Sequence, residues 1–139
     1  MEYADVVWDG CYENESNLLE SVQYEAAKIV SGAIKGTSMK RLLEDTGWEE
    51  MKTRRAIHKI LLFYKITNDL TPSYLKSLLK SKTCNRTHYI LRGGQNYSQY
   101  PVRTERFARS YFPSTTKLWN DISIEIRNAE SLSILKLDA

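Results

Sequence analysis

The sequence predicts a mainly α-helical fold: a small bundle of about five helices, with a basic loop or short β-hairpin at about 80–102. Apolar residues recur at three- and four-residue spacings through most of the chain, which is the period of an amphipathic helix. The stretch 80–102 is polar, contains Gly93-Gly94 and lacks that period. Of the 139 residues, 42% are hydrophobic, which is enough for a core, so we expect a single helical domain over 1–139.

The first long helix is expected over about 15–33. Its apolar face is predicted from residues at helical spacing, namely Leu18, Leu19, Val22, Ala26, Ile29, Val30 and Ala33. Asn14 suits the N-cap position, and Gly32 or Gly36 suits the C-terminal end.

Two more helices are expected in the middle of the chain. Ser38 is predicted to cap a short helix that ends near Gly47. The longest helix is predicted over 49–69, where Ile57 and Leu61 fall on one face. Acidic residues at its start and lysines further along suit the dipole of this helix.

The last helices are marked by proline and serine. Thr71-Pro72 is expected to end the long helix and to begin another, with Pro72 at its first position. Further helical pieces are predicted over 113–121, with Trp119 on the apolar side, and after Ser131.

The polar stretch between these helices has two interpretations. Residues 89–91 and 97–102 could be two short extended arms around the glycine pair. The same composition is equally compatible with an irregular loop.

Charge is distributed unevenly along the chain. Residues 1–20 contain six acids and no Lys or Arg, whereas residues 51–110 contain thirteen Lys or Arg and two acids. This asymmetry indicates either a middle segment that faces a polyanion or an acidic N-terminal segment that packs on it. A solvated basic helix face is the simpler alternative.

Tyr3-Ala4-Asp5 is one residue short of the Tyr-Ala-Asp-Asp box of reverse transcriptases. Two-metal chemistry needs carboxylates that converge on ions about 4 Å apart. Val6 follows Asp5, so the second acid of the box is missing. We therefore predict a helix or the entry to a helix there, with Val6, Val7 and Trp8 packing against other residues, and no catalytic residues.

Other cofactor or metal chemistry is not predicted. Cys84 and His88 have a ligand-like spacing, but a structural zinc site needs about four ligands, and the other thiol is Cys11. Two cysteines predict free thiols in a reducing compartment. The chain contains neither an apolar run of membrane-spanning length nor a signal peptide at its start, so we expect a nuclear or cytoplasmic protein that is not secreted and has no membrane partner.

Basic residues interleaved with aromatic ones are the remaining functional signal. Cations neutralise phosphates, and aromatic faces stack on unpaired bases. The residues predicted to contact RNA or DNA are Arg54, Arg55, Lys59, Arg86, Arg92, Arg103, Arg106, Arg109, Tyr89 and Tyr97. Alternatively, the aromatic residues anchor a loop to the core while the arginines are solvated.

The chain as a whole resembles the C-terminal, post-polymerase region of non-LTR (LINE-type, Jockey/CR1-like) retrotransposon reverse transcriptases. The resemblance lies in an ordered series of motifs: EYADVVWD at 2–9, LESVQYEAAKIVSG at 19–32, GWE at 47–49, RR at 54–55, FYKI at 63–66, RT at 103–104, RSYFPS at 109–114, LWN at 118–120 and EIRN at 125–128. These motifs extend over nearly the whole chain. Each is unspecific alone, and their order is the specific feature.

The resemblance implies a C-terminal fragment of a larger polyprotein whose endonuclease and RNA-directed DNA polymerase lie upstream. In that family the segment at 2–9 lies well after the catalytic box, so the match of Tyr3-Ala4-Asp5 to the box is coincidental. The expected function is therefore non-catalytic assistance in binding RNA or DNA. The alternatives are a structural segment that docks on the polymerase body of the parent polyprotein, or a translated relic without function.

Overall fold

The computed structural model describes residues 3–83 and 95–127, and these residues are mainly α-helical. The described ranges contain eight helices and no strand, which confirms the predicted mainly α fold. The chain divides into two compact units, Met1–Ala56 (unit 1) and Ile57–Ala139 (unit 2). The single domain expected from the sequence stays a prediction, because this division does not test whether the units unfold together.

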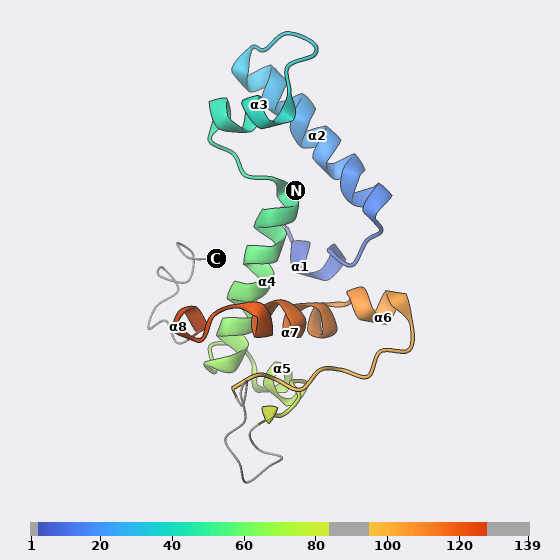
Figure 1. Ribbon diagram of the computed structural model, residues 1–139, viewed down its shortest axis with the longest axis vertical. Helices are drawn as coiled ribbons and strands as arrows, with labels where there is room; N and C mark the ends of the chain where they lie inside the picture. Colours follow the sequence, from blue (N-terminus) through green and yellow to red (C-terminus); the bar gives the residue numbers. More distant parts are fainter. Residues whose placement is uncertain (1–2, 84–94, 128–139) are drawn as a thin grey trace. The chain divides into compact units, whose positions relative to one another are not determined.

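Unit 1 contains α1 (Asp5–Trp8), α2 (Glu13–Ser31), α3 (Met39–Thr46) and the first part of α4 (Met51–Thr67), all labelled in Figure 1. Helices α2 and α3 pack against each other. Helix α4 lies within the range expected for it, but with 17 residues it is shorter than α2, which has 19, so the prediction that it is the longest helix was wrong.

The ends of α2 and α3 follow from local chemistry. The Glu15 carboxylate accepts a hydrogen bond from the Tyr12 N–H at 2.8 Å, so α2 begins at a cap on Tyr12 and not at Asn14. Gly32 ends α2 with a φ of 64°, a conformation that favours glycine. The predicted boundaries of α3 are confirmed by its caps on Ser38 and Gly47.

The buried face of α2 is not the predicted apolar face. Gln23 and Ala27 are buried, whereas Leu18, Val22 and Ile29 are exposed. Gln23 is buried because its amide is paired: Nε2 donates to the Glu49 carbonyl at 2.8 Å. A long polar side chain can therefore lie on the buried side of the helix when it forms a hydrogen bond with a main-chain carbonyl.

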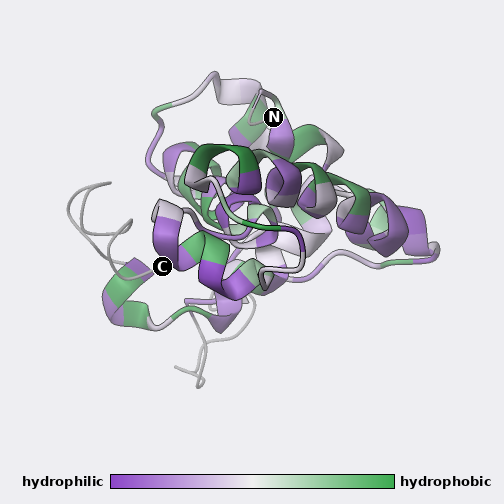
Figure 2. Cartoon of the chain, turned by 90° about the horizontal axis from the view of Figure 1, so that it is seen from above, coloured by the Kyte–Doolittle hydropathy of each residue, from purple (hydrophilic) through white to green (hydrophobic). Residues whose placement is uncertain are grey.

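Unit 2 contains the rest of α4 and four shorter helices, which are α5 (Ser73–Ser77), α6 (Glu105–Arg109), α7 (Tyr111–Asp121) and α8 (Ile124–Arg127). Helix α7 crosses the C-terminal part of α4 (Figure 1). Figure 2 shows that the helices carry hydrophobic and hydrophilic residues side by side, as amphipathic helices do.

The core of unit 2 is built around Phe63, which is fully buried. Its ring lies 5.0 Å from the Trp119 ring and 5.3 Å from the Tyr97 ring, measured between centroids. The Asn120 side chain forms two hydrogen bonds with the Tyr97 main chain, both at 2.9 Å. Its Oδ1 accepts from the Tyr97 N–H, and its Nδ2 donates to the Tyr97 carbonyl. These contacts join the segment after the polar stretch to α4 and α7.

The structure also corrects several predicted details. Pro72 is the N-cap of α5 rather than its first residue, and α7 begins two residues before Pro113. Helices α6 and α8 were not predicted, because each is too short to show a period. Near the polar stretch, Lys82 and Tyr97 form an isolated antiparallel bridge. The arm expected at 89–91 and the helix expected after Ser131 lie outside the described residues.

Candidate nucleic-acid interface

A groove in unit 2 collects side chains from three separate segments. Its volume is about 730 Å³, and it is lined by Lys59 of α4, by residues between 99 and 102, and by residues of α6 and α7. The lining contains three cations (Lys59, Arg109 and Lys117) and two acids (Glu105 and Asp121). The groove thus places two of the predicted nucleic-acid ligands, Lys59 and Arg109, in one cavity although they are far apart in sequence.

The wall formed by α6 and α7 is fixed by hydrogen bonds from hydroxyl side chains. The Thr104 hydroxyl caps α6 by accepting from the Phe107 N–H at 3.3 Å. Ser110 ends α6 and also precedes α7, and its extended backbone turns the chain between the two helices. The Ser114 hydroxyl donates to the Ser110 carbonyl at 2.9 Å, which closes the first turn of α7.

Tyr100 provides the aromatic surface of the groove. Its ring lies near those of Phe107 and Phe112, at centroid distances of 6.4 Å and 6.2 Å. The Tyr100 hydroxyl donates to the Leu78 carbonyl at 2.6 Å. Burial raises the pKa of this hydroxyl, and a backbone hydrogen bond from Lys80 lowers it in part. Tyr100 is half-buried, so part of the side chain is accessible from the groove.

Lys59 is 6% exposed, which does not fit a fully solvated charge. Its Nζ donates to the Ser114 hydroxyl at 3.3 Å, and the Tyr111 hydroxyl donates to the Lys59 carbonyl at 3.3 Å. Burial raises the pKa of Tyr111, so this phenol stays protonated and keeps its donor role. Lys59 therefore forms part of the groove wall and adds positive charge to it.

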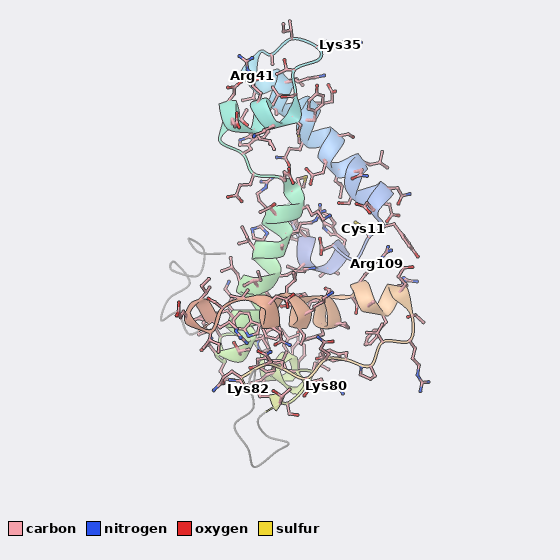
Figure 3. All side chains as sticks on the ribbon, viewed as in Figure 1. Cys11, Lys35, Arg41, Lys80, Lys82 and Arg109 are labelled. Carbon is pink, nitrogen blue, oxygen red and sulfur yellow. The ribbon has the colours of Figure 1, made fainter. Side chains whose placement is uncertain are left out.

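Arg103 and Arg106 are exposed on and beside α6, as expected for residues that contact phosphates. Arg109 is about one-third exposed and forms an ion pair with Glu105 one helical turn earlier. Figure 3 labels Arg109, together with Lys80 and Lys82. Lys80 and Lys82 lie over the rings of Tyr100 and Tyr97, at 5.6 Å and 5.7 Å from the ring centroids.

The other predicted residues do not join this groove. Arg54 and Arg55 belong to unit 1, where Arg54 donates to Gln23 and Arg55 is 3% exposed. Tyr97 packs on Phe63, and burial raises the pKa of its hydroxyl, so its ring is a core contact. The burial of Arg55 argues against direct contact with nucleic acid, whereas Tyr97 is only partly buried. Arg86, Tyr89 and Arg92 lie outside the described residues.

Lys117, Ser114 and Gln99 also line the groove, although they were not among the predicted residues. Ser114 and Lys117 are three residues apart on α7, on the side away from the buried Thr115, Thr116 and Trp119. Because Trp119 was predicted on the apolar side of this helix, the position of Ser114 and Lys117 on the opposite side could have been predicted from the sequence. That residues 99–102 line the groove could not be predicted from the sequence, because it depends on contacts between segments that are distant in sequence.

The Tyr3-Ala4-Asp5 segment leads into the short helix α1. Asp5 begins α1 and is buried, and its Oδ1 accepts from the Val6 N–H at 2.8 Å. The predicted helix is present, but Val7 is exposed and does not pack. In residues 3–83 and 95–127, no group of three or more His, Cys, Asp or Glu residues could hold a metal ion.

The fold and the groove define a class: a mainly helical protein with a cationic and aromatic groove in its C-terminal unit. No described helix has the length and apolar character required to span a membrane. Searches against protein-family models, curated proteins and solved structures found no match to this chain.

Proposed function

We propose that this chain is a non-catalytic, nucleic-acid-binding segment derived from a non-LTR retrotransposon reverse transcriptase. The observation that carries the binding proposal is the groove, which combines Lys59, Arg109 and Lys117 with the half-buried ring of Tyr100. Its origin rests on the ordered motifs along the sequence.

Single-stranded RNA or DNA suits such a site better than a duplex. Arg103 and Arg106 extend the positive charge from the groove along the exposed side of α6. Backbone phosphates would lie against these cations and release counterions, which favours binding at low salt. An unpaired base could stack on Tyr100, because every base offers a π face to an aromatic ring. The groove acids Glu105 and Asp121 reduce the net charge, so we expect moderate affinity.

The three arginines on and beside α6 should contribute most of the phosphate contacts. Arg103→Gln, Arg106→Gln and Arg109→Gln together should lower the affinity of the full chain for single-stranded RNA at least about tenfold at low salt. The slope of log affinity against log salt should also become shallower by about 2, because each lost phosphate contact removes about 0.7. Fluorescence anisotropy with a labelled oligouridylate measures both quantities.

A matched variant on unit 1 separates site-specific binding from general charge. Lys35→Gln, Lys40→Gln and Arg41→Gln remove the same charge from three exposed positions. This control should bind RNA like the unchanged protein. Equal losses in the two variants would show non-specific attraction, and an unchanged affinity in the α6 variant would rule out these arginines as ligands.

A further inference from the structure

Helix α2 has an exposed apolar side that no described residue of unit 1 covers. Leu18, Val22 and Ile29 are 67%, 53% and 81% exposed. They are four and seven residues apart and therefore lie on one side of the helix, which we call the α2 stripe. The buried residues Gln23 and Ala27 lie on the other side, where they pack within unit 1. Apolar side chains gathered in this way on a protein surface are typical of a contact with another macromolecule.

The two ends of α2 carry opposite charges. Residues 3–17 contain no Lys or Arg and four acids, of which Asp5 is buried and Asp9 pairs with Arg55. Residues 28–41 contain no acid and four Lys or Arg, of which Lys28 pairs with Glu25. Glu13 and Glu15 are exposed in the first turn of α2. At the other end, Lys35 and Arg41 lie near the loop that joins α2 to α3 (Figure 3).

We infer that two copies of this chain pair through α2 in antiparallel orientation. In that orientation the acidic end of each helix meets the basic end of the other, and the two helix dipoles also oppose. A second copy supplies both complementary ends at the matching distance, whereas a partner of uniform charge would be repelled at one end. A two-fold axis near the middle of the α2 stripe also brings each Leu18 close to the Ile29 of the other copy and the two Val22 side chains close to each other, so the stripe is complementary to itself.

The expected dimer is weak. A helix of the length of α2 is roughly 28 Å long, so a single helix pair forms an interface at the low end of specific contacts. The dimer is independent of the groove, which belongs to unit 2. If the chain does not dimerise, the RNA-binding proposal is unaffected. If the chain does not bind RNA, the dimer inference is unaffected.

Sedimentation equilibrium of the full chain under reducing conditions tests the inference. The apparent mass should rise toward that of a dimer between about 1 and 100 µM. Ile29→Ser should raise the dissociation constant at least about tenfold, because it removes an apolar side chain from the interface without touching the core of unit 1. Leu70→Ser, at an exposed apolar position in unit 2, is the matched control and should leave the dimer unchanged.

Charge exchange tests the antiparallel orientation. Glu15→Lys weakens the negative charge of the acidic end of α2, and Lys35→Glu weakens the positive charge of the basic end, so each variant alone should dimerise less than the unchanged chain. An equimolar mixture should recover association, because the basic and acidic ends then face each other. Glu15→Lys also removes the cap on Tyr12, so circular dichroism must show that α2 is retained.

The outcomes separate clearly. A concentration-dependent dimer that weakens in Ile29→Ser and reforms in the mixture supports the inference. A monomer throughout the concentration range overturns it, and so does a dimer that Ile29→Ser leaves unchanged. A dimer that needs the stripe but shows no recovery in the mixture overturns the antiparallel arrangement.

Discussion

Phe63→Ala should reduce the free energy of unfolding of unit 2 by about 3–5 kcal/mol. The side chain is fully buried and its ring lies between those of Tyr97 and Trp119, so truncation removes contacts on two sides and leaves a cavity. Urea unfolding followed by circular dichroism measures the loss. Because the mutated site is also next to the segment that leads into the groove, RNA affinity should fall in the same variant.

Phe107→Ala is the control for this prediction. Phe107 is 43% exposed and contacts Tyr100 from the surface of α6. Its truncation should reduce stability by about 1 kcal/mol. If the two alanine variants were equally stable, Phe63 could not be the centre of the core that we describe.

Arg55→Ala should destabilise unit 1 by about 3 kcal/mol. The guanidinium is buried, with Nε 2.8 Å from Asp9 Oδ1 and Nη2 2.6 Å from the Ser16 hydroxyl. It also lies over the Trp8 ring at 5.4 Å from the centroid. Removing it leaves the Asp9 carboxylate without its buried partner, which is costly in a region of low dielectric constant. Thermal and urea unfolding of the full chain measure the change.

A double-mutant cycle isolates the ion pair from the packing. Asp9→Ala combined with Arg55→Ala should cost less than the two single changes added together, because the Asp9–Arg55 pair is lost in each single variant and can be lost only once. Lys52→Ala, at an exposed position one turn earlier on α4, should change stability by less than about 0.5 kcal/mol. Additive effects of Asp9 and Arg55 would contradict the proposed coupling.

The helices could be predicted from the sequence because their signals are local. Periodic apolar residues mark α2 and α4, and Ser38 and Gly47 mark the ends of α3 through hydrogen bonding and a positive φ. The buried side of α2 could not be predicted in this way. It depends on the pairing of Gln23 with a carbonyl 26 residues later, which periodicity does not reveal.

The same limit explains the outcome for the candidate site. Arg55 and Lys59 were predicted as surface ligands from their charge, yet their partners Asp9 and Ser114 lie 46 and 55 residues away in sequence. Arg103 and Arg106 sit in a polar local sequence and are exposed as expected. Charge alone thus predicted that Arg103 and Arg106 are exposed, but it could not predict that Arg55 and Lys59 are buried against residues distant in sequence.

The central claim is that the groove of unit 2 binds single-stranded nucleic acid. Chemical-shift mapping of the ¹⁵N-labelled full chain, titrated with an oligouridylate at low salt, tests this claim most directly. We predict that the largest shifts fall on the amides of residues 99–109 and around Lys117, and that they saturate together. Shifts confined to α2, or no saturable shifts in the groove, would contradict it.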